Sequence, residues 1–234
     1  MEENRYSRTV NLIGAEKLEK IRSTSVLLLG VGGVGGICAE ALCRVGVKKL
    51  GLVDFDIFKE SNLNRQILST IKDLGRKKVE VAKERCALVN PDVQVDVFDL
   101  KIDERTVNDI PFEDYDFVID AIDDIKAKIL AIKKCREAAI KEIVCCGTGN
   151  NLFGEGFVIK DIKNSSYCPL AKKLRAELKK VGIYDGITVL FKNAEPFKRT
   201  DSANGYAPTS MFFAPNTAGI MLAGKVVEWI INDK

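Results

Sequence analysis

A glycine-rich segment constrains the fold of this 234-residue chain more than any other feature. It reads Gly30-Val-Gly32-Gly33-Val-Gly35-Gly36, and it lies between the apolar run 25–29 and the Ala-rich run 34–45. Glycines let a backbone turn tightly and approach phosphates closely, and the start of the next helix offers unpaired N–H groups to an anion. A strand, a glycine turn and a helix in this order predict a nucleotide-binding βαβ unit.

An acidic residue stands where such a unit needs one. Asp54 follows a second predicted strand at 48–53, about 20 residues after the glycine turn, where a carboxylate ordinarily binds a ribose hydroxyl. The pattern therefore indicates nucleotide binding, although it does not separate ATP from NAD or FAD.

The βα alternation continues to about residue 147 and predicts an α/β fold, Rossmann-like and doubly wound, with a mostly parallel sheet. We expect one domain over 1–234, with a nucleotide-binding core at about 25–150 and a substrate-side extension at about 151–234 that adds antiparallel structure. The predicted helices are 14–22, 34–45, 73–89, 124–139, 169–180 and 216–231, the predicted strands are 25–30, 48–53, 93–97, 117–120, 143–146, 153–162 and 187–191, and 192–213 is expected to be a polar loop.

Composition excludes several kinds of site. The chain has no histidine, so Ser-His-Asp triads, Cys-His dyads and His-ligated metals are impossible. Seven cysteines without any Cys-x-x-Cys pair predict reduced core thiols in a cytoplasmic protein and argue against zinc. The first residues lack the apolar region of a signal peptide, and no apolar run is long enough for a membrane span. The net charge of +3 is compatible with an anionic partner but does not require one.

Three polar clusters are expected at the mouth of the crevice: two follow predicted strands, and the third opens a predicted helix. In the first, Asp54-Phe-Asp56 precedes Ser61-Asn62-Leu-Asn-Arg65-Gln66, in which Arg65 can pair with phosphate oxygens and Asn62 can orient them. Alone, this segment would equally fit a solvated loop.

The other two clusters lie near predicted helix starts, and each carries charges of one sign. Lys78, in Gly75-Arg-Lys-Lys78-Val, can direct an ammonium group toward the crevice, or can be an ordinary charged helix start. In Asp120-Ala-Ile-Asp123-Asp124, a carboxylate can hold Mg²⁺ between phosphates, whereas Asp123 or Asp124 can equally act as a helix N-cap.

In chain order these motifs resemble the ubiquitin-activating-type adenylyltransferases, which include the activators of the molybdopterin and thiamine sulfur carriers. The resemblance covers residues 5–150, on Gly-x-Gly-Gly-x-Gly, Asp-x-Asp, Asn-x-x-Arg-Gln, Gly-x-x-Lys-Val, Asn-Pro and Asp-Ala-x-Asp. It implies binding of ATP and Mg²⁺, with Gly32 under the phosphates and Asp54 at the ribose. It further implies phosphate contacts from Asn62, Arg65 and Lys78, and it implies that Asp123 binds Mg²⁺ and the substrate carboxylate. The other residues that it implies around the nucleotide are Gly30, Gly33, Gly35, Asp56 and Gln66.

The opening Arg5-Tyr-Ser-Arg8 also matches this family. The resemblance implies that Arg8 reaches into the site of a partner subunit, and hence that the chain forms a homodimer with a trans arginine.

The second half is similar to tRNA threonylcarbamoyladenosine dehydratases, which activate a carboxylate with ATP before a ring closes within the substrate. This similarity rests on Cys146-Gly-Thr-Gly-Asn-Asn, Asp161-Ile-x-x-Ser, Pro169-Leu-Ala-Lys-x-Leu-Arg175 and Ala-Pro-x-x-Ala-Gly at 214–219. It departs at Cys168-Pro169-Leu170, where those relatives commonly have Asp-Pro, and at Phe153-Gly154. It implies a tRNA substrate, whose phosphates the basic run 172–180 either contacts or leaves to solvent.

Three alternatives stay open at this point. The chain can instead activate a ubiquitin-like or sulfur-carrier protein, with transfer to Cys145, Cys146 or Cys168. A NAD-dependent oxidoreductase would leave the cluster around Arg65 unexplained. A non-catalytic nucleotide-binding module would have no use for Arg65 and Asp123 together.

Overall fold

The computed structural model describes residues 4–195 and 209–232, and its strands form one sheet in the order β3-β2-β1-β4-β5-β7-β6. Only β6 runs antiparallel to its neighbour among the named strands of these residues, which confirms the predicted doubly wound, mostly parallel sheet with an antiparallel pair from the C-terminal part. The strands are β1 (Ser25–Leu29), β2 (Lys49–Val53), β3 (Gln94–Phe98), β4 (Phe117–Asp120), β5 (Lys141–Cys146), β6 (Phe157–Asp161) and β7 (Thr188–Lys192).

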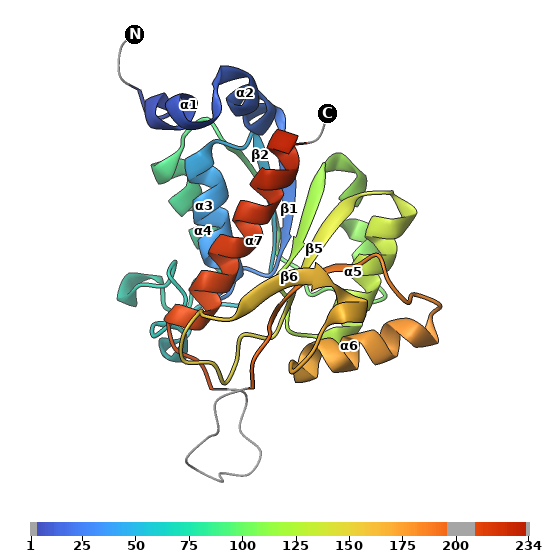
Figure 1. Cartoon of the computed structure of the whole chain (residues 1–234). Coiled ribbons are helices and arrows are strands. Elements are labelled where there is room, and N and C mark those ends of the chain that lie inside the picture. The colour runs from blue at the N-terminus through green and yellow to red at the C-terminus, as the bar shows by residue number, and fades with distance from the viewer. Residues whose placement is uncertain (1–3, 196–208, 233–234) are drawn as a thin grey trace.

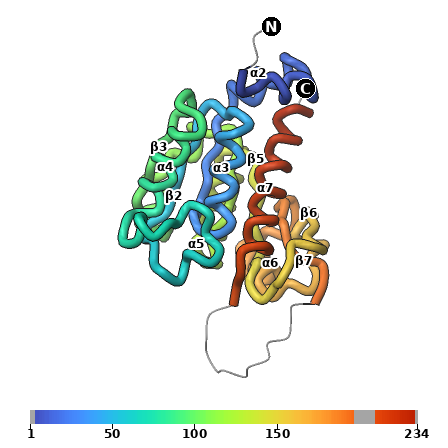
Figure 2. The backbone as a smooth tube through the Cα atoms, turned by 90° about the vertical axis from the view of Figure 1, so that its left-hand side faces the viewer, coloured from blue at the N-terminus to red at the C-terminus, as the bar shows by residue number. Residues whose placement is uncertain are grey.

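Helices cover both faces of this sheet (Figure 1). The helices α3, α4 and α7 pack into one apolar cluster, and α5 and α6 pack into two clusters on the other face. Figure 2 shows α7 running along the molecule beside α3, and the two helices are in contact. The helices are α1 (Ser7–Ile13), α2 (Ala15–Ser23), α3 (Gly35–Val45), α4 (Lys78–Val89), α5 (Ile125–Glu137), α6 (Pro169–Lys180) and α7 (Phe213–Asn232), with short 3₁₀ turns between them.

Most predicted elements are present, and the differences have local causes. The helix predicted from 73 begins at Lys78, because Gly75 has a φ of +83° and Lys77 is extended and bridges Ile57. Helix α7 begins at Phe213, within the predicted polar loop, and residues 196–208 of that loop lie outside the described residues. Helix α1 was not predicted, since none of its residues is buried.

None of the helices in the described part of the chain is both long and apolar enough to cross a membrane.

Strand β5 carries a buried acid that makes stability depend on pH. Burial, helped by the nearby Asp120, raises the pKa of Glu142 from 4.5 to about 8. Between these values the folded protein holds a proton that the unfolded chain has released, so stability falls as the pH rises through this window.

Glu142→Gln is therefore expected to stabilise the fold above pH 8, by up to about 5 kcal/mol, and to change little at pH 4 to 5, where Glu142 is already protonated. Urea unfolding of both proteins across this pH range measures the difference. An equal gain or loss at both ends of the range would contradict the titration of Glu142.

Candidate active site

A pocket of about 770 Å³ lies at the carboxyl edge of the sheet, beyond the ends of β1, β2, β4 and β5. The chain runs outward from β1 to β3 and then resumes on the other side with β4, so the strand order reverses between β1 and β4. Ligands of open α/β sheets bind at this kind of reversal. The pocket therefore occupies the expected position for a nucleotide site.

The glycine turn closes one side of the pocket, with Gly30, Gly32 and Gly33 in its lining. Gly30 has a φ of +87°, a backbone conformation that favours glycine. Gly35 lies behind the lining, and a Cβ atom there would stand 1.8 Å from the Gly30 carbonyl oxygen. The chain can therefore turn tightly into α3 only because both positions lack a side chain.

The carboxylate of Asp54 holds this turn in place. Its Oδ2 accepts a hydrogen bond from the N–H of Val31 at 2.7 Å, and its Oδ1 accepts one from the N–H of Asp56 at 2.9 Å. A carboxylate has further lone pairs, so Asp54 can still accept a bond from a ribose hydroxyl.

Two cationic side chains line the pocket beside the glycine turn. Lys78, the first residue of α4, is 5% exposed, and its Nζ lies 3.0 Å from Oδ2 of Asp56. Arg65 donates from Nη1 to the Ser61 carbonyl at 2.7 Å and to Oδ1 of Asn64 at 2.9 Å. Because a guanidinium carries five N–H groups, Arg65 retains donors for a phosphate.

Two residues with side-chain amides, both predicted as site residues, also line the pocket beside the glycine turn. Asn62 is buried, lines the pocket and accepts a bond from the Lys59 N–H at 3.0 Å, so it shapes the 3₁₀ turn Glu60–Asn62 that precedes Arg65. Gln66 is also buried in the lining, and its Oε1 has no partner within the described residues.

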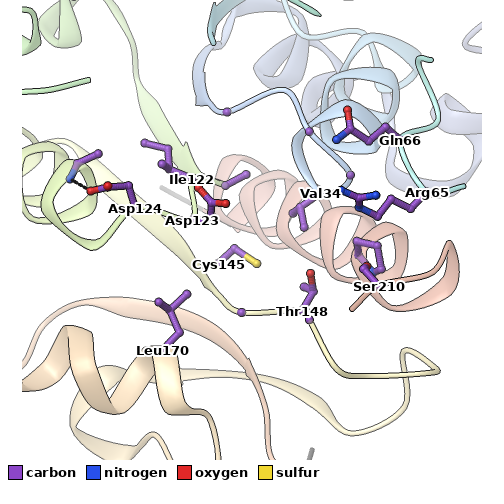
Figure 3. Close-up of a pocket in the computed structure, with 18 of the residues that line it drawn as sticks. Val34, Arg65, Gln66, Ile122, Asp123, Asp124, Cys145, Thr148, Leu170 and Ser210 are labelled. Atoms are coloured by element: carbon purple, nitrogen blue, oxygen red, sulfur yellow. Dashed lines mark hydrogen bonds between the residues drawn. The ribbon is translucent and has the colours of Figure 1, made fainter. Parts of the chain in front are cut away.

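The three aspartates between the last residue of β4 and the start of α5 have separate roles. Asp120 is fully buried and pairs with Lys128 at 2.8 Å, and Asp124 caps α5 by accepting from the Ala127 N–H at 2.9 Å. Asp123 is exposed, lines the pocket and makes no hydrogen bond within the described residues. Figure 3 shows Asp123 and Arg65 on facing sides of the pocket. Both Asp123 and Asp124 line the pocket, and Asp123 is the one with both carboxylate oxygens unbonded within the described residues, since Asp124 uses Oδ1 to cap α5.

Magnesium fits such a carboxylate, since Mg²⁺ is usually bound through one or two carboxylates together with substrate phosphates and water. Within residues 4–195 and 209–232, no group of three or more potential ligand residues is arranged to hold a metal by itself. A metal at Asp123 would therefore depend on the nucleotide.

The structure does not bring Arg8 to this pocket. Arg8 lies on α1, which Figure 1 shows at the end of the molecule where β1 and β2 begin, opposite the pocket. Its side chain is exposed and makes no hydrogen bond within the described residues. Arg8 cannot complete the site of its own chain in this arrangement.

Part of the lining was not identified from the sequence as a site. The segment after β5 contributes the motif Cys146-Gly-Thr-Gly-Asn-Asn to the family resemblance, but none of its residues is predicted as a site residue, and Phe55 and Leu100 carry no motif of their own. Asn216 donates from Nδ2 to the Arg65 carbonyl at 2.9 Å and so fixes the backbone of the arginine. The missed lining residues include Phe55, Leu100, Lys101, Ile102, Thr148, Asn150, Asn151, Tyr167, Leu170 and Ser210.

The cysteines are all free and buried, as predicted for core thiols. Cys145 and Cys168 line the pocket, but burial raises the pKa of Cys145 to about 12 and also raises that of Cys168. A reactive cysteine needs a lowered pKa, so neither thiol is activated here. Cys168 instead caps α6, with its Sγ accepting from the Ala171 N–H at 3.5 Å.

Comparison with known proteins agrees with this geometry. The family model described as "ThiF family" matches residues 6–233. The chain is 36% identical to the tRNA threonylcarbamoyladenosine dehydratase of Bacillus subtilis over 98% of this chain and 96% of that protein, and 31% identical to the Escherichia coli protein of the same name over 90% and 88%. A crystal structure of the E. coli dehydratase in complex with AMP superposes with a TM-score of 0.89 at 27% identity, covering 97% of this chain and 94% of that one.

Proposed function

Because the chain belongs to the ThiF family of adenylyltransferases, we propose that it adenylates the carboxylate of threonylcarbamoyladenosine in tRNA and lets the ring close to the cyclic nucleoside. The observation that carries the proposal is the pocket at the strand reversal, which brings Gly32, Arg65, Lys78 and Asp123 together. A NAD-dependent oxidoreductase is at odds with the family. The dehydratase named among the relatives matches this chain over nearly its full length, in keeping with a single adenylation domain over 1–234.

The proposed reaction starts when a substrate carboxylate oxygen attacks the α-phosphorus of ATP and pyrophosphate leaves. Arg65 and Lys78 stabilise the negative charge that develops on the phosphates. Asp123 would hold Mg²⁺, and the ion would supply positive charge for the pyrophosphate that leaves. A nucleophile within the same substrate then attacks the acyl adenylate and expels AMP. Water is lost overall, and no cysteine needs to react, which suits the buried thiols of Cys145 and Cys168.

The second subunit supplies the remaining charge in this proposal. Arg8 is exposed on α1, at the end of the sheet away from its own pocket, so it can act only in the pocket of another copy. A homodimer, with Arg8 of each copy near the phosphates of the other, would satisfy that requirement.

The first test measures pyrophosphate release from ATP and Mg²⁺ with tRNA that contains threonylcarbamoyladenosine, followed by mass analysis of the nucleosides. We expect ATP consumption together with a loss of about 18 daltons, one water, from that nucleoside. The same assay with a carrier protein that ends in Gly-Gly tests the second candidate. Exchange that responds to the carrier and not to tRNA would replace the dehydratase with a carrier activator.

A further inference from the structure

We infer that Tyr167 is a stacking platform for the purine base of the substrate nucleotide. This inference rests on the proposed function and identifies how the same pocket recognises a nucleoside. It concerns a residue that lines the pocket, carries no charge and belongs to none of the motifs around ATP.

The backbone around Tyr167 is strained. Its φ is +57°, rare for a bulky residue, and the Cys168 N–H donates to the Ser166 carbonyl at 2.6 Å, which closes a three-residue turn centred on Tyr167. Turns of this size with a positive central φ are uncommon and cost energy. The Tyr167 ring does not offset that cost through packing or hydrogen bonding, because the residue is 60% exposed and its hydroxyl has no partner in the described part of the chain.

The turn is held rigidly from both sides. Ser166 bonds through its hydroxyl to Oδ1 of Asn193, next to the end of β7, at 2.5 Å. Cys168 donates from Sγ to the Cys146 carbonyl at 3.1 Å and is the N-cap of α6. The ring is therefore presented at the pocket by a fixed loop, which lowers the entropy lost when a ligand stacks on it.

The position of the ring separates it from the ATP side. Within the described residues, Phe55 and Tyr167 are the two aromatic residues that line the pocket. Phe55 follows β2 next to Asp54, with the Lys101 Nζ 5.7 Å from its ring centre, so it belongs to the nucleotide side. Tyr167 lies with Leu170 on the wall formed by the start of α6, and Figure 3 shows Leu170 across the pocket from Arg65.

The wall that carries Tyr167 provides an aromatic ring and hydrogen-bonding groups, which suit a nucleoside substrate. A base taken out of a stack is commonly bound by an aromatic ring and by hydrogen bonds to its edge. Thr148 lines the pocket between the two walls and supplies a hydroxyl, and Asn151 supplies an amide. The Gly-Gly end of a carrier protein has no flat face, so a ring in this place favours a base over a peptide.

The test compares Tyr167→Gly, Tyr167→Phe and wild-type protein on tRNA that contains threonylcarbamoyladenosine. We expect Tyr167→Gly to lower kcat/KM for tRNA by about 10- to 100-fold, mainly through KM, since stacking on a ring contributes about this much per base. Tyr167→Phe keeps the ring and should stay within about threefold of wild type. The Kd for ATP should not change in either variant.

The glycine variant also carries a folding readout. Glycine adopts a positive φ without strain, so Tyr167→Gly should unfold at the same temperature as wild type or a higher one. Activity of Tyr167→Gly within threefold of wild type, or an equal loss in Tyr167→Phe, would overturn the stacking role while the proposed function stands. A wild-type protein that is inactive on this tRNA would overturn the proposed function itself, and the inference with it.

Discussion

Arg65→Ala is expected to lower ATP–pyrophosphate exchange by about 100- to 1,000-fold, because one preorganised charge that faces the developing negative charge is lost. The thermal stability of the fold should not change. Among the described residues, the Arg65 side chain bonds only the Ser61 carbonyl and Oδ1 of Asn64, both in its own turn. The bond from Asn216 reaches the Arg65 backbone and survives the substitution. The measurement is exchange of labelled pyrophosphate into ATP with substrate tRNA, beside a thermal unfolding curve.

Arg76→Ala is the matched control. Arg76 forms ion pairs with Asp73 and Glu84 on the surface and does not line the pocket, so its loss should leave exchange near the wild-type rate. Asp123→Ala should behave like Arg65→Ala, since Asp123 is exposed and makes no hydrogen bond with any residue that the structure describes. Near wild-type exchange in both Arg65→Ala and Asp123→Ala would show that the site has been assigned to the wrong residues.

The nucleotide side of the site could be predicted because its chemistry depends on residue types at fixed distances from strand ends. The spacing from Gly30 to Asp54 follows from one βαβ unit, and the structure joins the two through the bond from Asp54 to the Val31 N–H. The buried strands were equally clear, since four of the five residues of β1 and of β2 are fully buried and apolar or small.

The substrate side could not be predicted in the same way, because it is made of loop residues whose position depends on tertiary contacts. Tyr167 gains its place from bonds that Ser166 and Cys168 make to distant segments. The strand order could not be predicted from the sequence either, since β7 inserts between β5 and β6. The roles of Asp120 and Asp124 were undecided until Lys128 and the start of α5 were placed beside them.

The largest expected loss of stability comes from breaking the ion pair between Asp120 and Lys128. Both side chains are fully buried, and Nζ of Lys128 lies 2.8 Å from Oδ1 of Asp120. Burial alone would lower the pKa of Lys128, but the adjacent Asp120 carboxylate outweighs it and holds that pKa above its ordinary value. The lysine is thus the counter-charge of an acid that water cannot reach.

Lys128→Met keeps the apolar length of the side chain and removes the charge, which leaves Asp120 buried without a partner. We expect a loss of about 3–5 kcal/mol in the free energy of unfolding, measured by urea denaturation at pH 7.5. Lys126→Met is the control on the same helix, since Lys126 is exposed, and it should change stability by less than about 0.5 kcal/mol.

The double variant Asp120→Asn with Lys128→Met separates the charge from the packing. Asparagine can still accept the bond that Oδ1 of Asp120 receives from the Ile122 N–H at 2.9 Å, so the backbone that leads to Asp123 keeps its anchor. Most of the lost stability should return, because a buried pair replaced by neutral groups costs far less than one buried charge alone. If the double variant is as unstable as Lys128→Met, the lysine contributes through its packing, and the pair does not act as a charge couple beneath the pocket.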